Sequence, residues 1–143
     1  SKAGISYGAH GVWQMHHRGE SFNNMAYSGM PYDWRAALQF PGAWDVGYAK
    51  WLFEQYDMFS LKPSDALETR SSLVRMAESD DMAVIYTPYH DEFAVLRDLS
   101  GYRVEMIALE SRRVMTPLYA VKDGKTHFML SDCNEDMLII ARK

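Results

Sequence analysis

The pattern of hydrophobic positions changes character near residue 60. Before that point, apolar residues recur at helical spacing or stand in glycine-rich stretches, and after it they form short alternating runs. Residues 43–56 carry one helical stripe, with apolar side chains at i, i+4, i+7, i+8 and i+12, namely Trp44, Tyr48, Trp51, Leu52 and Tyr56. This spacing predicts an amphipathic helix over residues 43–56.

The pattern before this helix is mixed. Residues 5–12 predict a strand interrupted by glycines, and interior glycines of this kind accompany bulges or a close approach of the backbone to another group. Residues 19–32 predict a long irregular loop. We expect Asp33 to cap a short helix over residues 34–38, which Pro41–Gly42 ends.

The second half of the chain is typical of an antiparallel all-β domain. Apolar or alternating runs between turn residues predict six or seven strands, at residues 73–77, 82–86, 93–98, 104–108, 118–121, 126–130 and 137–141. Asp123–Gly124 lies between two of these runs and predicts a tight hairpin, because both turn positions must tolerate a positive φ. The strand spacing favours a β-sandwich over residues 60–143, with its junction to residues 1–59 near Ser60–Leu67.

Composition excludes some classes of function. The 143 residues carry a net charge of −4, which argues against a protein that binds nucleic-acid backbones through a basic face. No run of 18 apolar residues is present, so we predict no membrane span. Cys133 is the single cysteine, which excludes an internal disulfide. The chain begins with a segment typical of a buried strand, and we expect the chain to be the C-terminal part of a larger protein.

Candidate binding chemistry gathers near the N-terminus. Tyr7, Trp13 and Gln14 supply the aromatic faces and the amide that sugar sites use, and His10 adds an imidazole. The alternative is that Tyr7 and Trp13 simply fill a core beside the helix at residues 43–56. Three nearby histidines lack the spacing of a zinc motif, so we predict no metal and no cofactor; they are His10, His16 and His17.

The acidic residues are candidate catalytic groups, because glycoside hydrolysis needs two carboxylates that face each other across the scissile bond. Asp33 is expected to cap a helix, and the other acidic residues of the first part lie off the apolar stripe or in polar loops; these are Glu20, Asp45, Glu54 and Asp57. No pair stands out, so we assign no catalytic residue to this chain.

Three segments together resemble a known family. They are Tyr7-Gly8-x-His10-Gly11-Val12-Trp13-Gln14, then Trp34-Arg35-x-Ala37-Leu38-x-x-Pro41-Gly42-Ala43, then a helix carrying Leu52-Phe53-Glu54. These segments resemble the C-terminal region of apiosidase-like glycoside hydrolases, which are bacterial (β/α)₈-barrel enzymes acting on plant cell-wall polysaccharides. In that family a small β-sandwich, labelled as a collagen-binding domain, follows the barrel.

The resemblance implies an α/β plus all-β fold, the C-terminal end of a (β/α)₈ barrel followed by an antiparallel β-sandwich. Residues 1–59 would supply the last strand, loop and helices of the barrel, and residues 60–143 the sandwich. The helix at residues 43–56 would pack its stripe inward, on the barrel. The catalytic carboxylates of the family lie on earlier strands, which places them outside this chain.

The same resemblance implies a site and partners. Tyr7, His10, Trp13 and Gln14 would line the sugar subsite at the catalytic face of the barrel. The partners would be a carbohydrate substrate and the upstream barrel of the same protein, with no nucleic acid and no membrane. A secreted or periplasmic location would follow.

Two other functions fit the same residues. The chain could be a non-catalytic module that binds glycan or collagen, or its sandwich could only brace the barrel. A binding module should expose aromatic side chains on its strands. Six aromatics are available there, and most of them fit a core, which favours bracing; they are Tyr86, Tyr89, Phe93, Tyr102, Tyr119 and Phe128.

Overall fold

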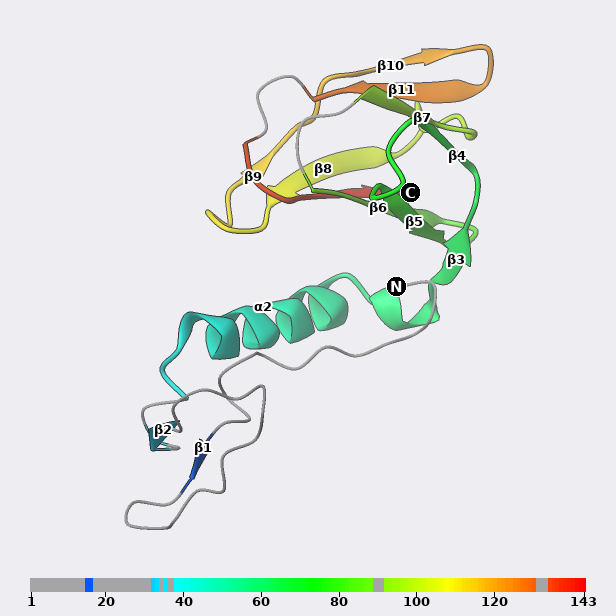
Figure 1. Cartoon of the computed structure of the whole chain (residues 1–143). Helices are drawn as coiled ribbons and strands as arrows, with labels where there is room; N and C mark the ends of the chain where they lie inside the picture. Colours follow the sequence, from blue (N-terminus) through cyan, green and yellow to red (C-terminus); the bar gives the residue numbers. More distant parts are fainter. Residues whose placement is uncertain (1–14, 17–31, 34, 36–37, 89–91, 131–133) are drawn as a thin grey trace. The chain divides into compact units, whose positions relative to one another are not determined.

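A computed structural model describes residues 15–16, 32–33, 35, 38–88, 92–130 and 134–143 of the chain (Figure 1). The chain divides into two compact units, one that ends at Phe59 and one that runs from Ser60 to Lys143. Among the described residues, no helix has the length and apolar character needed to cross a membrane.

The first unit contains one long described helix. Helix α2 spans Pro41–Gln55, and the 3₁₀ turn η2 follows at Met58–Ser60. The predicted helix over residues 43–56 is therefore confirmed, with a start two residues earlier. Pro41 opens α2, and the short helix that we expected it to end, over residues 34–38, lies largely outside the described residues. Proline suits the first helical turn because its missing N–H would have no partner there and its φ is already helical.

Two short strands are described ahead of this helix. Strand β1 (Met15–His16) and strand β2 (Tyr32–Asp33) pair in parallel, with Met15 opposite Tyr32 and His16 opposite Asp33. Parallel neighbours need a crossover connection and are typical of α/β folds. The predicted strand over residues 5–12 lies outside the described residues.

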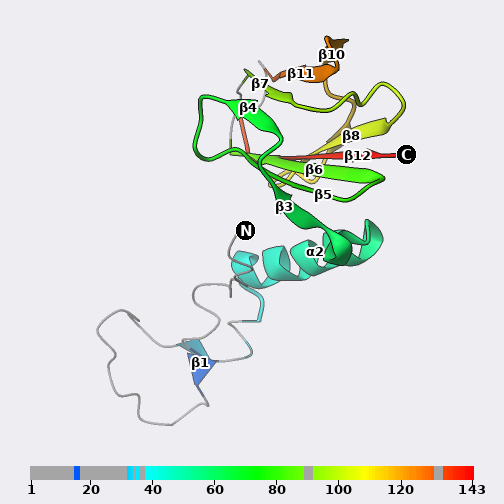
Figure 2. The same ribbon diagram turned by 90° about the vertical axis from the view of Figure 1, so that its right-hand side faces the viewer.

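The second unit consists of two antiparallel sheets that face each other as layers (Figures 1 and 2). The larger sheet has the order β3–β5–β6–β12–β8–β9 and the smaller one β10–β11–β7–β4. This confirms the predicted sandwich. The strands are β3 (Lys62–Ser64), β4 (Leu67–Thr69), β5 (Arg75–Glu78), β6 (Met82–Thr87), β7 (Glu92–Val95), β8 (Arg103–Ala108), β9 (Val114–Met115), β10 (Tyr119–Lys122), β11 (Lys125–Met129) and β12 (Met137–Arg142).

Three of these strands were not predicted, and all three lie at sheet edges. Strands β3 and β9 border the larger sheet, and β4 borders the smaller one. Pro63 in β3 has no N–H to donate, and a proline is tolerated in a sheet only at such an edge. Strands of two or three residues also show no alternation long enough to recognise, so the sequence indicates only a junction here.

The hairpin predicted from Asp123–Gly124 is confirmed. These residues connect β10 and β11, and their φ angles are 52° and 74°. A type I′ turn needs this left-handed backbone at both central positions, which glycine and aspartate tolerate better than bulky residues.

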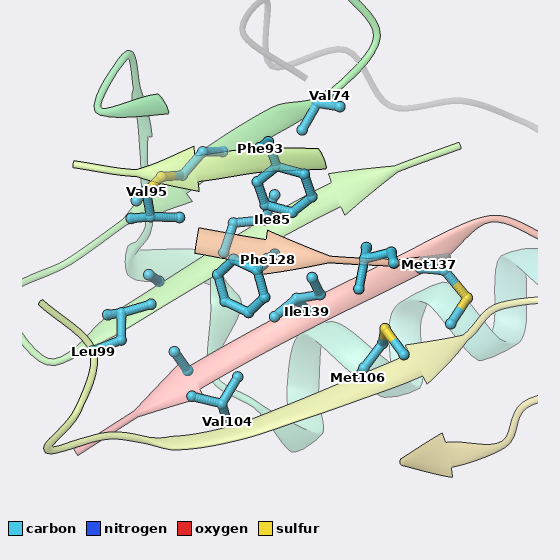
Figure 3. Packing of buried hydrophobic residues seen from close by; sticks show 14 of the residues in the cluster. Val74, Ile85, Phe93, Val95, Leu99, Val104, Met106, Phe128, Met137 and Ile139 are labelled. Carbon is cyan, nitrogen blue, oxygen red and sulfur yellow. The ribbon is translucent and has the colours of Figure 1, made fainter. Parts of the chain in front are cut away.

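The core lies between the two sheets and follows the alternation of the strands. One row of paired residues crosses the larger sheet on its inner face: Met76, Ile85, Ile139, Met106 and Met115. From the smaller sheet, Phe128 stacks on Phe93 with 5.3 Å between ring centroids (Figure 3). The two inner faces thus form one continuous apolar cluster.

Candidate functional site

The residues predicted to line a sugar subsite lie outside the described residues: Tyr7, His10, Trp13 and Gln14. Gln14 directly precedes β1 in the sequence, and the other three residues lie further upstream. Their role in a subsite stays a prediction.

Three acidic residues of the first unit have described side chains, and all three are exposed; they are Asp45, Glu54 and Asp57. Glu54 is exposed and pairs with Lys50 one helical turn away, at 2.6 Å between Nζ and Oε1. Asp45 lies on the exposed surface of α2, and Asp57 is exposed in the turn after it. Within the described residues, no group of three or more histidine, cysteine or carboxylate side chains is placed to hold a metal ion.

Helix α2 is apolar on two opposite sides. On one side Tyr48 and Trp51 stack with 5.7 Å between ring centroids, while Trp44 remains 58% exposed and Trp51 49% exposed. Phe53 lies about 180° around the helix from Trp44 and is 45% exposed. Of the predicted stripe, Leu52 is buried. A helix with apolar side chains on opposite faces is typical of a helix covered on both sides.

The larger sheet is also apolar on both faces. Ile140 pairs with Val84, and Leu138 pairs with Ile107, on the face opposite to the core residue Ile139. Ile140 and Ile107 are fully buried, although neither belongs to the cluster between the sheets. An antiparallel sheet commonly leaves its outer face polar and solvated. The outer face of this sheet is instead built to be covered.

The aromatic side chains of the sandwich serve its interior. Phe93, Tyr102 and Phe128 are buried, and Tyr86 and Tyr119 are half-buried. Tyr89 lies outside the described residues. In the part of the sandwich that the structure describes, no aromatic ring is exposed as a platform on which a sugar ring could stack. The expectation that most of these rings fit a core is confirmed for the described ones.

A carboxylate clamp holds the β8–β9 loop to the segment before β12. Oε2 of Glu135 accepts hydrogen bonds from the N–H groups of Glu110 (3.0 Å) and Ser111 (2.7 Å), and Oε1 accepts one from the Ser111 hydroxyl (2.8 Å). The bonds from Ser111, followed by that from Glu110 and the charge of Arg113, hold the pKa of Glu135 below its usual range.

The neighbouring residue Asp136 anchors the same segment to the larger sheet. The Tyr86 hydroxyl donates a hydrogen bond of 2.7 Å to Oδ2 of Asp136. Burial, then this hydrogen bond and the charge of Asp136, raise the pKa of Tyr86 to about 12. Both contacts join residues far apart in sequence, and no motif in the sequence pointed to them.

We expect the clamp to weaken when Glu135 is protonated. The folded state lowers the pKa of Glu135, so the stabilisation is present above pH 4.5, the ordinary glutamate value, and is lost as the pH falls through the lowered pKa. An amide NMR titration should show the Ser111 N–H signal moving with a midpoint below pH 4.5.

Glu135→Gln should abolish this titration, whereas Glu110→Gln, which removes a carboxylate of the same loop, should leave it in place. A midpoint at the ordinary glutamate pKa, or a titration that survives in Glu135→Gln, would contradict the clamp.

A comparison with known protein families gives a match for the first unit. Residues 1–60 match the family described as "Apiosidase-like, catalytic domain". The match covers all three segments on which the resemblance was based, and it does not extend over the sandwich. A search of curated protein sequences gave no match.

A solved structure described as "Glycoside hydrolase" is similar to nearly the whole chain. The TM-score is 0.67 at 15% sequence identity, over 94% of this chain and 32% of that one. The likeness shows a shared fold, and the chain spans about a third of the length of the matched protein. Together with the helix and the two antiparallel sheets, it confirms the predicted fold class.

Proposed function

We propose that this chain is part of an apiosidase-like glycoside hydrolase and acts on a carbohydrate. The observation that carries the proposal is the match of residues 1–60 to the catalytic domain of that family. Residues 1–59 would complete the barrel, and residues 60–143 would form a sandwich that braces it. The catalytic carboxylates would come from upstream strands.

The bracing role is supported by two surfaces. Val84, Ile107 and Ile140 on the outer face of the larger sheet are buried although they lie outside the cluster between the sheets, and α2 is apolar on opposite sides. Surfaces of this kind are expected where one part of a protein covers another.

The substrate contacts are proposed to come from Tyr7, His10, Trp13 and Gln14. If residues 7–13 formed a regular strand, Tyr7 and Trp13 would share one side of it and His10 would point away from them. A bulge at Gly8 or Gly11 would bring His10 to the same side, and glycine permits the backbone conformation that such a bulge needs.

Deletion of residues 60–143 from the full-length enzyme separates bracing from binding. If the sandwich braces the barrel, the catalytic part needs it to stay folded. The truncated enzyme should then aggregate or lose activity even on a small soluble aryl glycoside. If the sandwich is a glycan- or collagen-binding module, the truncated enzyme should keep that activity and lose only its retention on polysaccharide or collagen. The second outcome would overturn the bracing role.

The enzymatic part of the proposal is tested by release of reducing sugar from plant polysaccharide fragments. The full-length enzyme should be active, and the chain of residues 1–143 alone should release none. Trp13→Ala in the full-length enzyme should lower kcat/KM while leaving the melting temperature unchanged. Turnover by the chain alone that depends on one of its own carboxylates would contradict this assignment.

A further inference from the structure

A hollow of about 330 Å³ opens at the rim of the sandwich, where the chain passes from β3 to β4 and back to β5 (green in Figure 2). Its apolar lining comes from Leu67, Val74 and Met76, which belong to the core between the sheets or pack against it. The rest of its lining is polar.

Two arginines on this rim lack a carboxylate partner. Arg70 makes no hydrogen bond or ion pair with the described residues, and Arg75 donates only to the carbonyl of its neighbour Val74, at 2.8 Å. Elsewhere in the sandwich the pattern is different, because four arginines are each paired with a glutamate: Arg97, Arg103, Arg113 and Arg142. Two arginines without a carboxylate partner among the described residues therefore line one hollow.

The charge of the hollow differs from that of the chain. Asp65 is the one carboxylate in its lining, against the two guanidinium groups, so the hollow is positive while the whole chain carries −4. Both arginines are exposed, so an incoming ligand can reach them without displacing protein groups.

Hydroxyl groups on the same rim are held in place by the backbone. Thr69 Oγ1 accepts a hydrogen bond from the Ser71 N–H at 3.1 Å, and Ser71 Oγ accepts one from the Leu73 N–H at 3.2 Å. These bonds fix the loop between β4 and β5 and leave the Ser71 hydroxyl able to donate outward. Ser72 adds a further hydroxyl to the lining.

We propose that this hollow binds an anionic saccharide. The planar guanidinium groups of Arg70 and Arg75 match the paired oxygens of a carboxylate or a sulfate ester, and the serine hydroxyls match sugar hydroxyls. The volume lies at the lower end of small-molecule sites, roughly 300–1,000 Å³, which suits a mono- or disaccharide. The choice of a saccharide rests on the proposed function, whereas the preference for an anion rests on the arginines alone.

Isothermal titration of the whole chain with small sugars tests the proposal. Sodium glucuronate and glucose 6-sulfate supply the two sources of negative charge, and glucose is the neutral control. We expect at least one of the two acidic sugars to bind and glucose to bind more weakly. The affinity for the acidic sugar should fall as the salt concentration is raised from about 0.05 M to about 0.5 M. The tighter acidic ligand then identifies the group that the arginines prefer.

Charge-removing variants locate the binding to the hollow. Arg70→Gln and Arg75→Gln should each weaken binding by roughly fivefold to tenfold, because each removes a charge-assisted hydrogen bond. Arg103→Gln is the matched control, since that arginine is also exposed but lies on β8 and pairs with Glu105. Circular dichroism of all three variants verifies that the strands remain folded.

Four outcomes would overturn the proposal. They are no binding of either acidic sugar, equal binding of glucose, affinities in Arg70→Gln and Arg75→Gln that match Arg103→Gln, and inorganic sulfate binding as tightly as glucose 6-sulfate. None of these results depends on hydrolysis, so failure here is distinct from failure of the proposed enzymatic function.

Discussion

Replacement of Phe128 by alanine is expected to lower the free energy of unfolding of the sandwich by about 3–5 kcal/mol. Phe128 is 1% exposed, and its ring stacks on Phe93 with 5.3 Å between centroids and contacts the tilted ring of Tyr119 at 5.6 Å. Removing the ring takes away its burial and leaves a cavity that the neighbouring strands cannot close completely. Urea denaturation followed by the circular dichroism of the strands measures the loss.

Met129→Ala provides the matched control on the same strand. Met129 follows Phe128 on β11, points to the opposite face and is 43% exposed, so its truncation should cost less than about 1 kcal/mol. All four tryptophans precede residue 60, so their fluorescence reports on the first unit separately. Equal losses in the two variants would contradict the packing described for Phe128.

Thr126→Val is expected to cost about 2–4 kcal/mol although it preserves the shape of the side chain. Thr126 is fully buried, and its hydroxyl donates to the carbonyl of Arg97 at 2.8 Å and accepts the N–H of Leu99 at 3.0 Å. Valine fills the same space but leaves that carbonyl and that N–H without partners. Denaturation of the variant in urea gives the difference in free energy.

Thr126→Ser tests the reason for this loss. Serine keeps the hydroxyl and removes only one buried methyl group, so we expect a cost of about 0.5–1.5 kcal/mol. A serine variant as unstable as the valine variant would show that the hydroxyl hydrogen bonds contribute little at this position.

The sequence predicted the strands of four residues or more and missed those of two or three. Residues 137–141 form an unbroken apolar run because β12 lies in the middle of the larger sheet and is buried on both faces. The Asp123–Gly124 turn was predictable because few residues tolerate its backbone. The edge strands β3, β4 and β9 were not, since their formation depends on the neighbour with which each pairs.

The candidate sites differ in how far local sequence could reveal them. The segment around Tyr7 and Trp13 matches a family because it is continuous and rich in rare residue types. The Glu135 clamp joins residues 24 and 25 positions apart, which only the folded topology brings together. The hollow is lined by residues 64–76, and its shape depends on two crossings between the sheets.

The place of β12 in the larger sheet has a consequence for synthesis of the chain. Strand β12 separates β6 from β8 and pairs with both, yet it is made of residues 137–142. During translation β6 and β8 emerge first, and each presents an unpaired, apolar edge until β12 has left the ribosome. Unpaired edges of this kind invite pairing with other chains. A sandwich whose last strand lies at a sheet edge would leave fewer such edges unpaired during translation. We therefore expect this sandwich to need more protection of its nascent strands, either by chaperones or by fast release of the chain from the ribosome.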